Sequence, residues 1–145
     1  MPYSFHAEVA GGWGEDTAVD ATVHPPIVEY LDYEVQGWLG DDLITSFPVH
    51  LVSPRLLEAM QRAGLRGFSE QPSSKYTISI DEQLLLLEGE DVKNSYVLEF
   101  KWISVGEGLD PDLFLTEGFL LGLSDKAWQV ISDFNVSNGV VERLG

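Results

Sequence analysis

FPVHLVSPRLLEAMQRAGLRGF, residues 47 to 68, predicts a complete strand–helix–strand unit. Its first six residues are an apolar run that is typical of a strand. Ser53 and Pro54 then supply an N-cap hydroxyl and a proline at the first helical position. The apolar residues that follow recur at helical spacing, and Gly64 can adopt the left-handed conformation that ends a helix.

A second stretch, FLLGLSDKAWQVISDFNVSNGV at residues 119 to 140, repeats this pattern with its capping serine 71 residues after the first. Ser124 aligns with Ser53, and the apolar and polar positions of the following helix keep their class. The match predicts a structural duplication, in which two capped amphipathic helices pack on one sheet through corresponding faces. Neither stretch carries reactive groups, so we interpret both helices as core-packing elements. Four side chains would take equivalent places in that core: Leu57, Met60, Trp128 and Ile131.

The rest of the chain predicts short strands separated by turns. Alternating or β-rich patterns predict strands at 3–9, 27–35, 76–80 and 96–105, the last of them near the middle of a sheet. Residues 11–14 predict a glycine-rich turn or bulge, 15–26 and 69–74 predict loops, and the leucine run at 81–88 predicts a short helix. The sum is an α+β fold with about six or seven strands in a mixed or antiparallel sheet. If the two units make parallel crossovers, the fold is mixed α/β instead.

Length and composition predict one domain over residues 1–145, large enough to bury a core without disulfides or metals. The chain has no cysteine, which excludes disulfides, thiol catalysis and zinc–thiolate sites. The first residues carry neither a basic segment nor a long apolar run, so we expect no signal peptide and no membrane span. These features predict a cytoplasmic protein.

Negative charge dominates the sequence, with 24 acidic residues against 8 basic ones and a formal net charge of −16. The charge is also uneven, because residues 1–54 contain nine acidic residues and no Lys or Arg. Such a field opposes binding to nucleic acid and to anionic membranes, and it favours a basic protein partner. An acidic surface that only keeps the protein dispersed is the alternative.

The sequence contains few groups that suit catalysis. Its three histidines, His6, His24 and His50, lack metalloprotease spacing, and we interpret His50 as a strand-face residue and His6 as pointing outward. Asp41-Asp42 and 110–112 could bind a divalent cation, but neither matches a calcium-binding loop. We therefore expect no enzyme activity, no cofactor and no metal. A small carboxylate- or metal-dependent enzyme and a structural or adaptor domain are the alternatives.

Several short motifs together resemble a family of small bacterial proteins, the immunity-type proteins of polymorphic toxin systems. The motifs are GWLGDDL at 37–43, FPVHLVS at 47–53, AGLRGF at 63–68, FKW at 100–102, DLFL at 112–115 and LGLSDKAW at 121–128. The resemblance spans about residues 24–145, apart from 69–95. It implies a cytoplasmic antidote that binds and blocks a toxin domain, with no catalytic residues. An acidic surface would suit this role if the toxin has a basic substrate cleft.

The uneven charge points to residues 1–54 as the face that binds a partner. Two places in this region combine an aromatic anchor with adjacent acids on a glycine-rich turn, a pattern that suits a binding hot spot. We predict that both contact the partner, against the alternative that each tryptophan is buried in the core. The predicted partner-binding residues are Trp13, Glu15, Asp16, Trp38, Asp41 and Asp42.

Overall fold

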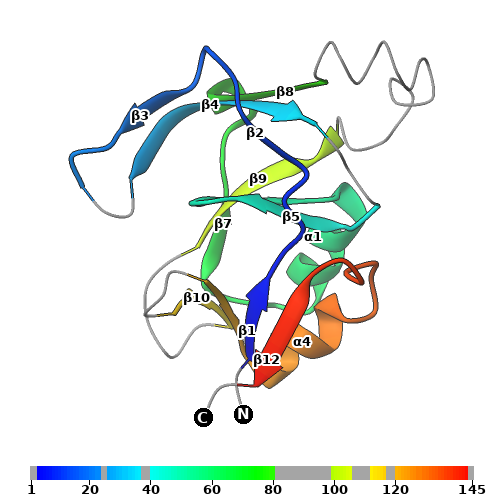
Figure 1. The fold of residues 1–145 in the computed structure, drawn as a ribbon. Coiled ribbons are helices and arrows are strands. Elements are labelled where there is room, and N and C mark those ends of the chain that lie inside the picture. The colour runs from blue at the N-terminus through cyan, green and yellow to red at the C-terminus, as the bar shows by residue number, and fades with distance from the viewer. Residues whose placement is uncertain are drawn as a thin grey trace.

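The computed structural model of the chain describes residues 3–23, 26–36, 40–80, 99–105, 112–116 and 120–143. These residues form twelve strands, two α-helices and one short 3-10 helix, which confirms the α+β class (Figure 1). The strand number exceeds the predicted six or seven. The elements are β1 (Tyr3–His6), β2 (Gly11–Trp13), β3 (Ala18–Asp20), β4 (Ile27–Val35), β5 (Leu43–Ser46), β6 (Val49–Val52), α1 (Pro54–Arg62), β7 (Phe68–Glu70), η1 (Ser73–Lys75), β8 (Tyr76–Ile80), β9 (Lys101–Val105), β10 (Leu113–Leu115), β11 (Leu121–Leu123), α4 (Asp125–Ile131) and β12 (Val140–Arg143).

The described strands form three four-stranded sheets rather than the one sheet that the sequence predicted. Two sheets have the orders β5-β6-β9-β7 and β10-β11-β1-β12, and all their pairings are antiparallel. The third has the order β2-β4-β3, with β8 added to β4 in a parallel pairing.

The first two sheets are built in the same way. Each contains a hairpin, β5-β6 or β10-β11, followed by a helix, α1 or α4, and an outer strand, β7 or β12. The remaining strand of each sheet comes from the other half of the chain. β9, which precedes the second hairpin, lies between β6 and β7, and β1, which precedes the first hairpin, lies between β11 and β12. The two halves therefore exchange one strand each.

Both helices begin at the predicted serine caps. The Ser53 hydroxyl accepts a hydrogen bond from the Leu56 N–H at 3.2 Å, and the Ser124 hydroxyl accepts one from the Ala127 N–H at 3.1 Å. Gly64, with φ of +69°, follows the end of α1 in the left-handed conformation that only glycine adopts without strain.

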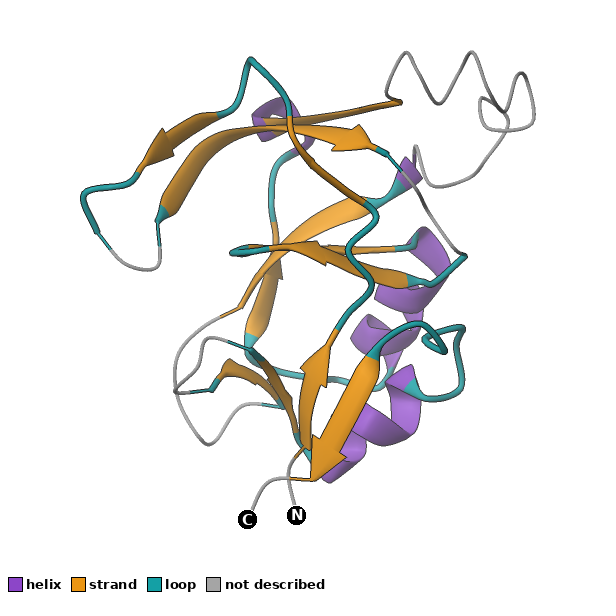
Figure 2. Cartoon of the chain, in the orientation of Figure 1, coloured by secondary structure: helices purple, strands orange, loops and turns teal. Residues whose placement is uncertain are grey.

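The helices lie next to each other and share one apolar core, which we call the first core (Figure 2). Leu56, Leu57 and Met60 of α1 and Ala127 and Ile131 of α4 are buried there, among strands of both exchanged sheets. The helices thus cover the junction of two sheets, which corrects the prediction that they pack on one sheet. Trp128 is only partly buried, with its ring 5.8 Å from that of Tyr3.

A second core lies between the β2-β4-β3 sheet and the sheet that contains β9. It includes Leu31, Tyr33 and Val35 of β4, packed with Leu51 and Trp102. In β9, Trp102 belongs to the second core and its neighbour Ile103 to the first. Both faces of this strand are therefore buried, which confirms its predicted central place.

Several local predictions were wrong. Residues 11–13 pair with β4 and form β2 rather than a turn. Glycine is needed at position 11 because a side chain there would overlap the backbone carbonyl of Glu34 on β4. Residues 18–20, predicted as loop, form β3, which pairs antiparallel with the first half of β4. Within 47–52 the strand begins only at Val49, and within 69–74 β7 extends to Glu70. The predicted helix at 81–88 and residues 96–98 of the predicted strand lie outside the described residues.

Candidate functional site

The structure separates the predicted partner-binding residues into three groups. Asp41 and Asp42 are 0% exposed, so they are not the surface pair that the sequence suggested. Trp38 lies outside the described residues. Trp13 is half-buried in β2 and packs against the second core, whereas Glu15 and Asp16 are exposed in the turn that follows.

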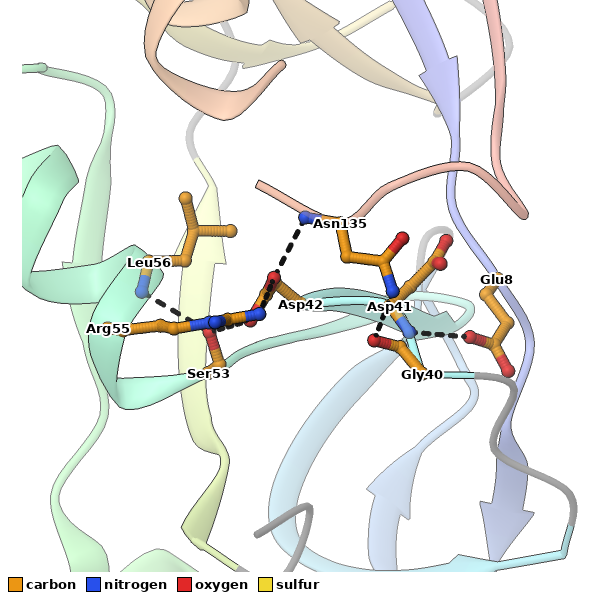
Figure 3. A network of polar contacts seen from close by, with 8 residues as sticks. All are labelled: Glu8, Gly40, Asp41, Asp42, Ser53, Arg55, Leu56 and Asn135. Atoms are coloured by element: carbon orange, nitrogen blue, oxygen red, sulfur yellow. Dashed lines mark hydrogen bonds and ion pairs between the residues drawn. The ribbon is translucent and has the colours of Figure 1, made fainter. Parts of the chain in front are cut away.

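Asp42 is buried because it links both halves of the protein (Figure 3). Its carboxylate accepts hydrogen bonds from the Ser53 hydroxyl at 2.6 Å, from Arg55 Nε at 2.7 Å and from the Asn135 N–H at 2.9 Å. Burial alone would raise the pKa of Asp42, but these hydrogen bonds outweigh it and hold the pKa below its usual value. The residue therefore fixes the cap of α1 to the loop that follows α4.

Asp112 makes the reciprocal connection. Its carboxylate accepts from the Ser124 hydroxyl, the cap of α4, at 2.7 Å, and from the N–H of Arg66, just after α1, at 2.9 Å. Here too burial favours a higher pKa, and the hydrogen bonds from Ser124 and Arg66 lower it instead. The sequence contains a pattern that could have predicted the pairing of Asp42 and Asp112 with the helix caps. An Asp-Leu dipeptide begins 11 residues before Ser53 and 12 residues before Ser124.

Asp41 holds the same loop from the other side. Its carboxylate accepts from the Asn138 N–H at 3.0 Å and from Asn138 Nδ2 at 2.8 Å. The Asp41 N–H in turn donates to the buried carboxylate of Glu8 at 3.3 Å (Figure 3). The acidic pair 41–42 is thus part of the internal framework, and we assign the partner-binding candidates elsewhere.

Within the part of the chain that the structure describes, residues 11–36 carry an acidic surface, which we call the acidic arm. This stretch contains six carboxylates and no Lys or Arg. It forms β2, β3 and β4, and the β3-β4 hairpin projects from the body of the protein on the side away from α1 and α4 (Figure 1). The exposed acids are Glu15, Asp16 and Glu29. The half-buried acids are Asp20, Asp32 and Glu34.

The outer part of the acidic arm also exposes aliphatic side chains that the sequence analysis did not single out. Val19, Val23 and Ile27 are 37%, 44% and 55% exposed. Asp20 is the register partner of Ile27 across the β3-β4 pair, so an acid and an aliphatic side chain lie side by side there. The pairing of β3 with β4 shifts register between Ala18 and Val19, so the alternation of side chains along the sequence does not predict which residues lie next to each other.

Hydrogen bonds order the base of the acidic arm. The Gly14 N–H donates to the Asp32 carbonyl at 2.7 Å, and the Asp16 N–H donates to the Asp32 carboxylate at 3.3 Å. The Asp32 N–H donates to the Thr17 hydroxyl at 2.9 Å, which in turn donates to the Asp32 carbonyl at 3.1 Å. The carboxylates of Glu15 and Asp16 are therefore carried on an ordered turn, with Trp13 fixing its inner end.

The described part of the chain also contains hollows outside the acidic arm, of which two concern us. A groove of about 580 Å³ lies between α1 and α4, and its basic residues Arg55 and Arg62 form ion pairs with Asp42 and Glu58. A smaller pocket of about 100 Å³ lies between β1, the β5-β6 turn and the start of β11. His50 lines this second pocket and is 6% exposed, and burial lowers its pKa to about 4.

Comparison with protein-family models, with curated proteins and with solved structures found no match. Within the described ranges, no group of three or more His, Asp or Glu side chains is placed to hold a metal ion. Among the same residues, no helix has the length and apolar character needed to cross a membrane. The candidate site with the clearest physical character is therefore the acidic arm.

Proposed function

We propose that this protein is a non-enzymatic binding protein that docks its acidic arm on a basic protein, as an immunity protein does when it neutralises a toxin domain. The supporting observation is that the acidic arm carries six carboxylates without a single Lys or Arg, and that its β3-β4 hairpin projects from the body of the protein. We place this encounter in the cytoplasm, where an antidote to a bacterial toxin would be needed.

Charge and shape contribute to binding in different ways. The net charge of −16 attracts a basic partner over distance and raises the rate of encounter. Contact energy must come from groups that lose water on binding, and Val19, Val23 and Ile27 supply aliphatic surface for this. Asp20 lies beside Ile27, Glu29 is exposed on β4, and Glu15 and Asp16 are exposed at the base of the arm, so these acids would pair with basic side chains at the rim of the interface.

Asp41, Asp42 and Asp112 support this reading because their roles are structural. Asp42 and Asp112 receive hydrogen bonds from helix caps and backbone N–H groups, and Asp41 binds Asn138. These interactions engage three of the acids that the sequence offered as cation ligands, while Asp110 lies outside the described residues. No described observation favours the alternative of a carboxylate- or metal-dependent enzyme.

The test is association with a basic toxin domain encoded by a neighbouring gene, measured by stopped-flow kinetics and by protection of cells that express the toxin. Glu15→Gln with Asp16→Asn should slow association several-fold at low ionic strength and flatten its salt dependence. Val19→Ser with Ile27→Ser should mainly accelerate dissociation.

The matched control removes the same number of charges elsewhere. Glu70→Gln with Asp133→Asn neutralises two exposed acids outside the acidic arm and should leave the association rate close to that of the unmodified protein. If both double variants slow association equally, only net charge matters and the acidic arm is not the docking site. Absence of any complex with the toxin domain would remove the proposed function.

A further inference from the structure

We propose that the pocket between β1, the β5-β6 turn and the start of β11 is an anchor site for one aliphatic side chain of a basic protein partner. This inference rests on the proposed function, because it concerns a second contact made by the same partner. We call this hollow the anchor pocket; it is lined by Phe5, His6, Ala7, Val9, Thr45, Phe47, His50, Leu120 and Leu121.

The rim of the anchor pocket is exposed and apolar. Val9, Phe47 and Leu120 are 60%, 46% and 39% exposed, although each comes from a different part of the chain. The floor is formed by buried side chains, including Phe5 and Leu121. Exposed apolar side chains gathered around a hollow are typical of binding surfaces, because covering them removes apolar area from water.

The size and charge of the anchor pocket specify the kind of group it accepts. Its volume of about 100 Å³ is smaller than the ~150 Å³ cavity that accepts benzene, so a leucine- or isoleucine-sized side chain fits better than an aromatic ring. Among the described lining residues two are titratable, His6, which is exposed on β1, and His50, which is buried; the lowered pKa of about 4 keeps the His50 imidazole neutral at pH 7. A neutral, apolar hollow selects an uncharged aliphatic group.

Charge complementarity decides between a basic partner and a second copy of the chain. With a net charge of −16, two copies repel each other, whereas a basic partner is attracted. The turn of the β5-β6 hairpin and the acidic arm both lie on the side away from the helices (Figure 1). A stable interface uses ~20–30 residues of each partner, more than the exposed part of the acidic arm supplies, so a partner docked there needs further contacts on this side.

The test uses two synthetic peptides as probes, an acetylated and amidated Lys-Lys-Leu-Lys-Lys and the same peptide with serine in place of leucine. Chemical shifts of the full chain are followed by NMR at low ionic strength. Both peptides should shift amides of the acidic arm, and only the leucine peptide should shift Val9, Phe47 and Leu120. Burial of the leucine should make that peptide bind roughly tenfold more tightly than its serine counterpart.

Phe47→Ser should abolish the difference between the peptides, and because Phe47 is exposed in a turn this variant should fold. Val141→Ser, an equally exposed position on β12 that does not line the anchor pocket, should preserve the difference. Shifts in the acidic arm without any in the anchor pocket would overturn the anchor site and leave the proposed function standing. Absence of shifts in the acidic arm would count against the proposed function itself. A peptide-free dimer that Phe47→Ser dissociates would assign the anchor pocket to a second copy and overturn the proposal.

Discussion

Replacing His50 should remove a specific loss of stability in mild acid. His50 lies on β6 opposite Thr45, and burial lowers its pKa from 6.5 to about 4. As pH falls through 6.5, the unfolded chain binds a proton at this position while the folded protein does not, so the free energy of unfolding decreases until about pH 4. Each pH unit within this window costs about 1.4 kcal/mol, which gives a total of about 3 kcal/mol.

The comparison is between the unmodified protein and His50→Gln, which cannot titrate. Urea unfolding followed by tryptophan fluorescence at pH 7.5, 6.5, 5.5 and 4.5 gives the free energy of unfolding at each pH. The variant starts from a lower stability because a buried ring is replaced, but its pH slope should be flatter by about 1 kcal/mol per unit. His6→Gln, at an exposed position of β1, should keep the original slope. Equal slopes for His50→Gln and the unmodified protein would refute the reasoning.

The reciprocal aspartates and the glycines give further predictions. Asp42→Ala should lower the free energy of unfolding by roughly 3 kcal/mol, because buried Ser53 and the Asn135 N–H lose their acceptor and Arg55 loses its partner. Asp112→Ala should lower it by roughly 1–2 kcal/mol, because that site is partly exposed. Urea unfolding at pH 7 measures both values. The folded protein lowers the pKa values of Asp42 and Asp112 below the value of about 3.8 in the unfolded chain. The contribution of each carboxylate to the free energy of unfolding is therefore complete above pH 3.8 and is lost as pH falls further. Below that pH, Asp42→Ala and Asp112→Ala should approach the stability of the unmodified protein. A constant difference down to pH 2 would contradict this. Gly122→Ala should lower the free energy of unfolding by roughly 1–3 kcal/mol, because the added methyl group would overlap the buried Phe114 ring. Gly12→Ala places its methyl group in open space and should leave the free energy of unfolding unchanged or raise it slightly. Thermal melts that rank these two variants in the opposite order would show the β10-β11 packing to be wrong.

Local signals in the sequence were sufficient for the helices and for several strands. A serine cap followed by apolar residues at helical spacing depends only on neighbouring residues, and α1 and α4 begin where those signals placed them. The strand β4 matches its predicted bounds, 27–35, for the same reason.

Long-range pairing could not be predicted from such signals. The pattern at 3–9 predicts a strand but not its partners β11 and β12, which lie more than a hundred residues away. The glycines at 11–14 were predicted to form a turn, but glycine is also common where two backbones approach closely. Only the pairing of β2 with β4 shows that the second case holds here. Asp41 and Asp42 were assigned to the surface because acids are rarely buried, and their partners Asn135 and Asn138 lie far along the chain.

The exchange of strands also determines when the protein can complete its fold during synthesis. Tyr3 pairs with Leu123 on one side and with Arg143 on the other, so β1 waits for partners that are 120 and 140 positions further along the chain. At ordinary rates of translation this delay is roughly 10 to 30 s. For that period β1 has neither of its partner strands, so its backbone N–H and C=O groups are open to pairing with another molecule, the kind of exposure against which chaperones protect newly made chains.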